Sequence, residues 1–195
     1  MQVKGTAFDV KEKRDAWKEF AAKCDPNHLV FLDESGVNTN MTRLYGRSIG
    51  KARVEDHAPL NTPKTTTVLS SVRMDGSKAT VCYTGGTTGD RFVEFLKQTL
   101  IPTLKPGDIV VMDNLRSHHV KAVQELFDNK EYHIAYLLPY SPDFNPIEKV
   151  WSKMKSILKK LKIRDAAKLP DAINNSLALV TPTDCNHFFL SCGYC

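Results

Sequence analysis

Two short and fully apolar runs, each followed at once by an aspartate, constrain the fold of this chain most. The run Leu29–Leu32 precedes Asp33, and the run Ile109–Met112 precedes Asp113. Apolar runs of this length are typical of strands that are buried on both faces, as in a parallel sheet covered by helices. We therefore expect both aspartates at the carboxyl ends of central strands, the edge where open α/β sheets form their sites.

The remaining segments predict strands and helices in a definite order. A helix is expected within residues 1–23, and β-rich segments over 65–73 and 78–84 meet at Asp75-Gly76, which favours a hairpin. Helices and strands then alternate, so the later strands should be parallel with right-handed crossovers. The last strong helix should start near Asn145-Pro146. The predicted fold class is α/β: a mixed five-stranded sheet, antiparallel hairpin strands and then parallel strands, flanked by helices.

Composition places the chain among ordinary globular proteins. Its 195 residues suit one main domain, which we place at 28–168, after a helical lead-in over 1–27 and before a helical tail over 169–195. No apolar run approaches the ~20 residues that a membrane span needs. The charged N-terminus is unlike a signal peptide, and five cysteines without regular spacing favour a reducing cytoplasm.

A third carboxylate completes a candidate metal site. Glu148 lies in the first turn of the last helix, where it can converge with Asp33 and Asp113. Mg²⁺ prefers oxygen ligands, and two such ions roughly 4 Å apart can activate an attacking oxygen and stabilise a leaving one. The arrangement therefore suits phosphodiester chemistry.

Each acidic residue also has a structural interpretation. An aspartate after a strand is often a turn or cap residue, and Glu148 stands three residues after Asn145, where it could complete a capping box. Glu34 should point to the opposite face of the strand from Asp33. Asp143, in a Ser-Pro-Asp turn, is expected to bond to backbone. Residue chemistry alone leaves both interpretations open.

Three segments resemble the DDE transposases of the mariner superfamily, in the branch carried by bacterial insertion sequences. They are Phe31–Ser48, Val110–His119 and Leu138–Lys155, and 34 residues separate Asp113 from Glu148, as in that branch. The resemblance implies an RNase H-like fold for the main domain and a catalytic, metal-binding triad made of Asp33, Asp113 and Glu148. It also implies two Mg²⁺ or Mn²⁺ ions, with supporting residues at Asn114, His118 and His119.

The activity implied by this resemblance is metal-dependent DNA cleavage at transposon ends, followed by 3′-hydroxyl strand transfer into target DNA. Two alternatives remain: an RNase H-like nuclease without strand transfer, and a truncated or repurposed copy that only binds DNA. Fewer than 33 residues precede Asp33, too few for the helix-turn-helix region that such transposases usually carry. We therefore expect a separately encoded helix-turn-helix polypeptide as a partner, or a truncated copy. A homodimer in the DNA complex and a bacterial cytoplasmic location, at the nucleoid when DNA-bound, complete the prediction.

Basic residues indicate where DNA could bind. The net charge is +5, and residues 148–168 contain eight Lys or Arg and only two acids. Such a stripe suits a polyanion, although a solvated lysine face is the ordinary explanation. Two groups are predicted to contact phosphates: a Gly-containing excursion soon after Asp33, and one face of the Glu148 helix. The residues are Arg43, Arg47, Lys51 and Arg53 in the excursion, and Lys149 and Lys153 on the helix.

Overall fold

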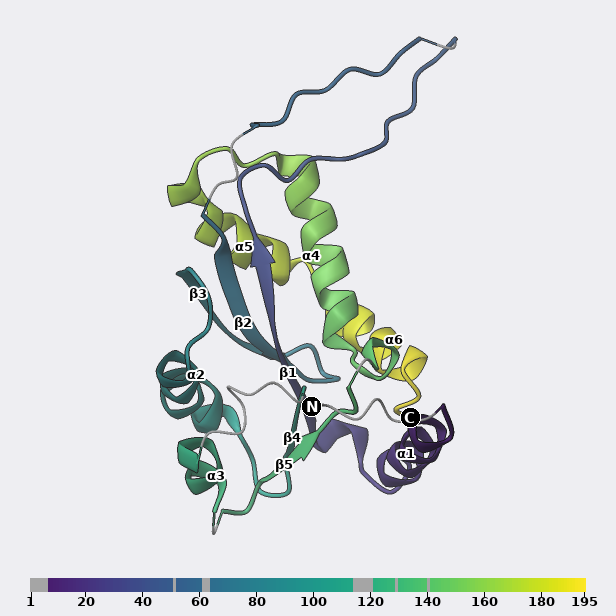
Figure 1. Ribbon diagram of the computed structural model, residues 1–195, viewed down its shortest axis with the longest axis vertical. Helices are drawn as coiled ribbons and strands as arrows, with labels where there is room; N and C mark the ends of the chain where they lie inside the picture. Colours follow the sequence, from purple (N-terminus) through teal and green to yellow (C-terminus); the bar gives the residue numbers. More distant parts are fainter. Residues whose placement is uncertain (1–6, 51, 61–63, 114–120, 129, 140) are drawn as a thin grey trace.

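The computed structural model describes residues 7–50, 52–60, 64–113, 121–128, 130–139 and 141–195 (Figure 1). Five strands form one mixed sheet in the order β3-β2-β1-β4-β5. β2 is antiparallel to both β1 and β3, whereas β1, β4 and β5 run parallel. The predicted sheet is thus confirmed. Its strands are β1 Leu29–Val37, β2 Thr66–Val72, β3 Lys78–Thr84, β4 Ile109–Met112 and β5 His133–Tyr136.

Helices cover both faces of this sheet. α1, α4, α5 and α6 lie on one face, and α2 and α3 lie on the other (Figure 1). α2 continues directly into the π-helical turn η2, Leu96–Leu100. The helices are α1 Ala7–Ala21, α2 Gly89–Phe95, α3 Lys121–Phe127, α4 Ile147–Leu161, α5 Leu169–Ala178 and α6 Pro182–Ser191.

The hairpin between β2 and β3 has the turn that its sequence predicts. The Asp75 carboxylate accepts a hydrogen bond from the Ser77 N–H at 2.8 Å, and Gly76 adopts φ +87°. A Cβ atom at Gly76 would lie 2.9 Å from the Cα of Pro182, the first residue of α6. Glycine is therefore required here both by the backbone conformation and by the close approach of α6.

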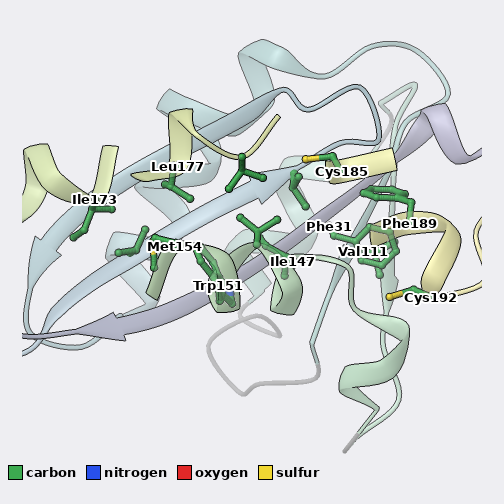
Figure 2. Packing of buried hydrophobic residues seen from close by; sticks show 14 of the residues in the cluster. Phe31, Val111, Ile147, Trp151, Met154, Ile173, Leu177, Cys185, Phe189 and Cys192 are labelled. Atoms are coloured by element: carbon green, nitrogen blue, oxygen red, sulfur yellow. The ribbon is translucent and has the colours of Figure 1, made fainter. Parts of the chain in front are cut away.

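Two apolar cores follow from the alternation of side chains along β1. Phe31 packs with α4, α5 and α6, whereas Val30 and Leu32 pack with α2, η2 and α3. Figure 2 shows the first core, in which Trp151 and Met154 of α4 lie over the sheet. Full burial of one such side chain contributes roughly 1.5–3 kcal/mol. Because alternate residues share a face, Asp33 lies on the α4 side of the sheet and Glu34 on the other.

β1 is longer than the sequence predicted. Pairing with β2 continues from Asp33, opposite Ser70, to Val37, opposite Thr66. Asp33 therefore lies in the middle of β1. We had expected it at the carboxyl end of the strand. The apolar run marks only the part of β1 that β4 also pairs with, since that parallel ladder stops at Leu32.

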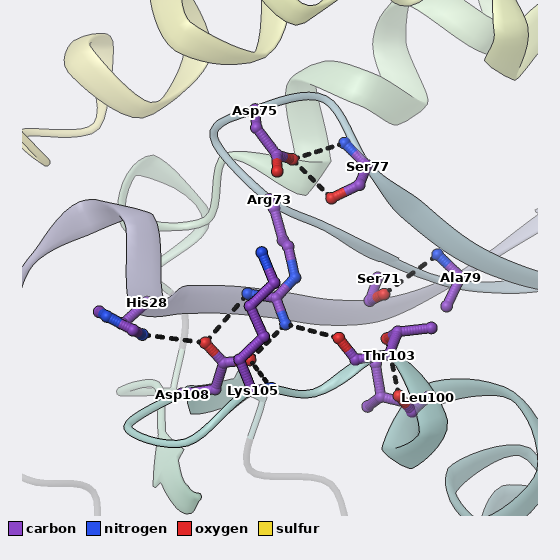
Figure 3. Close-up of polar contacts among 10 residues, drawn as sticks. All are labelled: His28, Ser71, Arg73, Asp75, Ser77, Ala79, Leu100, Thr103, Lys105 and Asp108. Carbon is purple, nitrogen blue, oxygen red and sulfur yellow. Dashed lines mark hydrogen bonds and ion pairs between the residues drawn. The ribbon is translucent and has the colours of Figure 1, made fainter.

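A buried ion pair between Arg73 and Asp108 lies at the start of β4, the end opposite to Asp113 (Figure 3). Asp108, just before β4, is fully buried and accepts hydrogen bonds from Arg73 Nη1 at 3.0 Å and the Lys105 N–H at 2.7 Å. His28 Nδ1 lies 3.1 Å from the same carboxylate. Burial alone would raise the pKa of Asp108, but these hydrogen bonds, that of Arg73 first, hold it below its usual range.

The lead-in and tail share the first core with the main domain. Trp17 of α1, Ile173 of α5 and Phe189 of α6 are all buried in it. Whether the three predicted segments fold as separate units stays a prediction. Within the described ranges, no helix is both long enough and apolar enough to cross a lipid bilayer.

Candidate active site

Asp33 is a buried carboxylate that is held at both oxygens. Only 8% of the residue is exposed. Its Oδ1 accepts a hydrogen bond from the Glu34 backbone N–H at 2.7 Å, and its Oδ2 accepts one from the Trp151 indole at 3.2 Å. The side chain thus faces α4, and two donors fix the plane of its carboxylate.

Asp113 lies beside Asp33 because of the parallel register between β1 and β4. Leu32 pairs with Met112 at the last step of that ladder, so the next step brings Asp33 and Asp113 side by side. Neighbouring strands are about 4.8 Å apart. Asp113 directly follows β4 and is partly exposed.

Glu148 comes to the same region from α4. It is exposed in the first turn of that helix, and its backbone N–H donates to the Asn145 carbonyl at 3.2 Å. The helix begins at Ile147 with Pro146 as its N-cap, and no side chain caps it. The expected cap by Asn145 is therefore wrong, and so is the capping-box interpretation of Glu148. The side chain of Glu148 remains available for chemistry.

The charges of Glu148 and Asp113 act on the Asp33 carboxylate. The pKa of Asp33 is raised from 3.8 to about 7, chiefly by burial and in addition by the negative charges of Glu148 and Asp113. The hydrogen bonds from Glu34 and Trp151 act in the opposite direction without offsetting the rise. The carboxylates therefore lie within electrostatic reach of one another, and a bound cation would relieve their repulsion.

The donor set at this site fits a hard divalent cation. Three carboxylates offer oxygen atoms only, which is the chemistry that Mg²⁺ and Mn²⁺ accept. In the described part of the chain, however, no three His, Cys, Asp or Glu side chains already stand close enough to hold an ion. The three carboxylates therefore interact electrostatically, but the described residues do not form a ready-made ligand set.

The neighbouring acids have structural partners. Glu34 points to the other face, as predicted, where it accepts a hydrogen bond from Thr87. The Asp143 carboxylate makes the expected backbone hydrogen bond, to its own N–H, and it also pairs with Arg14 of α1. The Arg14 guanidinium also lies 4.3 Å from the centroid of the Phe144 ring. Arg14 thus links α1 to the turn that leads into α4, a contact that no local pattern predicted.

The predicted DNA-contacting residues fall into two different settings. Lys149 Nζ donates to Ser191 Oγ at 2.5 Å, and Lys153 Nζ pairs with Asp184 Oδ2 at 2.5 Å. Both lysines therefore contact α6. The three described arginines of the excursion, Arg43, Arg47 and Arg53, are instead exposed.

We call residues 38–65, between β1 and β2, the arm, and its described residues project far from the body of the molecule (Figure 1). β1 continues four residues beyond Asp33, so the root of the arm lies farther along the chain from that carboxylate than the sequence predicted. Arg164, just after α4, fastens the root by donating to the carbonyls of Thr39 at 2.7 Å and His57 at 3.3 Å. Lys162 pairs with Asp56 at 2.6 Å.

Four of the proposed residues lie outside the described part of the chain. They are the three supporting residues Asn114, His118 and His119, and the arm residue Lys51. Their roles stay predictions. Sequence reasoning missed Trp151 as a site residue, although its position three residues after Glu148 places both on one face of α4.

The comparisons with known proteins concern the family and the fold of the chain. Residues 28–170 match the family model described as DDE superfamily endonuclease. The search of curated protein sequences finds no match. Among solved structures, the chain resembles the catalytic domain of Mos1 mariner transposase with a TM-score of 0.68 at 12% identity, covering 98% of this chain and 92% of that chain.

Two further structures show how far this likeness extends. The mariner Mos1 paired end complex with Mg gives a TM-score of 0.75 at 14% identity over 98% of this chain, which spans only 60% of that chain. The catalytic core domain of HTLV-2 integrase gives 0.51 at 16% identity, covering 83% of this chain and 97% of that one. The fold is RNase H-like, as predicted. The family match over most of the sequence shows that the chain belongs to the DDE superfamily endonucleases.

Proposed function

We propose that this chain is the catalytic domain of a mariner-superfamily transposase from the bacterial insertion-sequence branch, with Asp33, Asp113 and Glu148 as its catalytic triad. It would cut DNA strands at transposon ends and join the freed 3′-hydroxyl to target DNA. The observation that best supports this is the raised pKa of Asp33, to which burial and the charges of Glu148 and Asp113 contribute. In a DDE endonuclease fold, three coupled carboxylates are suited to phosphodiester chemistry.

The three carboxylates would hold two Mg²⁺ or Mn²⁺ ions, which supply activation of the attacking oxygen and stabilisation of the leaving one. Asp33 contributes a carboxylate whose orientation is fixed by two N–H donors. Glu148 contributes an exposed carboxylate on α4. Mos1 paired end complexes have been solved with Mg and with Mn, which supports the choice of ion.

DNA is the proposed partner, and the arm is its first proposed contact. Exposed Arg43, Arg47 and Arg53, together with Lys51, can neutralise phosphates without reading sequence. Lys149 and Lys153 would join them by exchanging their α6 partners for phosphate. Recognition of transposon ends would require a helix-turn-helix region, and the DNA complex would contain a homodimer. The setting would be the bacterial cytoplasm, at the nucleoid.

Nicking of supercoiled plasmid DNA tests the proposal. Asp33→Asn, Asp113→Asn and Glu148→Gln each remove one anionic ligand at constant size, so each should abolish Mn²⁺-dependent nicking. Glu34→Gln is the matched control, because its carboxylate lies on the opposite face of β1 and should leave nicking intact. Full activity in any folded triad variant would remove that residue from the site.

Joining of a pre-cut 3′-hydroxyl end to plasmid DNA separates the proposed transposase from its alternatives. The strand-transfer product should appear with the wild-type chain and vanish in all three triad variants. Nicking without joining would favour the nuclease that lacks strand transfer. DNA binding without either reaction would favour a copy that only binds DNA.

A further inference from the structure

The two tryptophans of this chain each donate an indole hydrogen bond, but to different kinds of acceptor. Trp151 is 3% exposed, and its indole N–H donates to Asp33 Oδ2 at 3.2 Å. Trp17 is 8% exposed, and its indole N–H donates to Tyr194 Oη at 3.0 Å. Both rings pack in the same core. Only the Trp151 indole bonds to a carboxylate of the candidate site.

The Trp151 indole bridges the two elements that carry Asp33 and Glu148. Trp151 lies on α4, three residues after Glu148, and it reaches across to the middle of β1 (Figure 2). An α-helix places residues three apart on one face. A fixed contact between Trp151 and Asp33 therefore also fixes the rotation and height of the first turn of α4, and with them the position of Glu148.

The contact leaves Asp33 able to bind a cation. Each carboxylate oxygen has two acceptor sites, and the described residues occupy one on each: Glu34 N–H on Oδ1 and Trp151 Nε1–H on Oδ2. The remaining acceptor sites keep a fixed direction, because two donors prevent rotation of the carboxylate plane. A pre-oriented ligand binds a metal more tightly than one that must be ordered first.

We propose that Trp151 is a positioning residue of the metal site, whose indole N–H orients the Asp33 carboxylate and locks the Glu148-bearing turn of α4 against β1. The inference rests on the proposed function, since that function makes Asp33 and Glu148 metal ligands. The ring of Trp151 fills the core, as many aromatic residues could. The N–H group is what the site requires.

The test compares Trp151→Phe with Trp17→Phe. Each change keeps an aromatic ring in the core and removes one indole hydrogen bond, but only the first removes a bond to Asp33. Binding of Mn²⁺ is measured directly from the electron paramagnetic resonance signal of the free ion, without DNA. Loss of an outer partner of a metal ligand typically costs 10–100-fold in affinity. We expect roughly tenfold weaker binding for Trp151→Phe and unchanged binding for Trp17→Phe.

Intrinsic fluorescence gives a second measurement that does not depend on the stability of Trp151→Phe. In the Trp17→Phe protein the only remaining tryptophan is Trp151, so paramagnetic Mn²⁺ at the site should quench its emission. Adding Asp33→Asn should remove that quenching. Equal Mn²⁺ affinity in the two single variants, or no quenching in Trp17→Phe, would overturn the inference.

The experiment also separates failure of the inference from failure of the proposed function. If the wild-type chain binds Mn²⁺ but does not nick DNA, the proposed function is refuted, and the two affinities still decide the role of Trp151. If nicking occurs, its half-maximal Mn²⁺ concentration should rise roughly tenfold in Trp151→Phe and not in Trp17→Phe. An unchanged half-maximal concentration in Trp151→Phe would refute the inference alone.

Discussion

Replacing Asp33 by Asn should stabilise the metal-free protein while it abolishes cleavage. The carboxyl group is buried beside two other carboxylates, so its ionised form is unfavourable in the folded chain. Its folded pKa of about 7 lies above its ordinary value of 3.8. The folded state therefore holds a proton that the unfolded state releases, and the free energy of unfolding falls as pH rises from about 4 to 7.

The size of this effect follows from the two pKa values and the hydrogen bonds. The gap between 3.8 and about 7 corresponds to a cost of about 4 kcal/mol at pH 8. The amide introduced by Asp33→Asn has one oxygen, so it would accept a hydrogen bond from only one of the two N–H donors. The Trp151 indole N–H would then face the NH₂ group without an acceptor, and this unsatisfied buried donor would cost about 1–3 kcal/mol of stability. The variant should gain about 1–3 kcal/mol at pH 8. At pH 5 the gain should vanish, because the charge cost is then smaller by about 2–3 kcal/mol.

Urea unfolding followed by circular dichroism, in EDTA at pH 5 and pH 8, measures this difference. In thermal melts each kcal/mol should raise Tm by about 2–4 °C for a chain of this size. Glu94→Gln, at an exposed carboxylate of α2, serves as control and should change stability by less than about 0.5 kcal/mol. If Asp33→Asn is less stable than wild type at pH 8 as well as at pH 5, the carboxylate is not under the electrostatic cost described above.

Three further predictions concern residues outside the Asp33, Asp113 and Glu148 site. Asp108→Asn should lower the free energy of unfolding, measured by urea unfolding, by about 3–5 kcal/mol, because Arg73 stays buried without its counter-charge. In the wild type, the stability that Asp108 contributes should be lost as pH falls below 3.8 through its depressed pKa. Arg164→Ala should free the root of the arm and speed trypsin cleavage inside it several-fold, and an unchanged cleavage rate would mean that the contacts of Arg164 do not hold the arm. Replacing Arg43 and Arg47 by Ala should weaken DNA binding equally on transposon-end and scrambled duplexes, and should flatten the salt dependence by roughly one unit per lost phosphate contact; a hundredfold preference for end DNA would contradict this.

The sequence by itself determined the sheet and its order of elements. Continuous apolar runs at 29–32 and 109–112 predicted buried parallel strands, and Asp75-Gly76 predicted the hairpin, because these signals are local to the chain. The helical spacing of apolar residues also predicted the buried face of α4. The alternation of β1 also predicted correctly that Glu34 would face away from Asp33.

Only the tertiary structure decided where these elements end and what their side chains contact. β1 continues past its apolar run because β2 offers it hydrogen-bond partners up to Val37, and no local signal marks that pairing. The contacts of Trp151 with Asp33 and of Arg14 with Asp143 join residues more than a hundred positions apart. Such contacts depend on how helices pack on a finished sheet. The burial that raises the pKa of Asp33 likewise exists only once α4 covers β1.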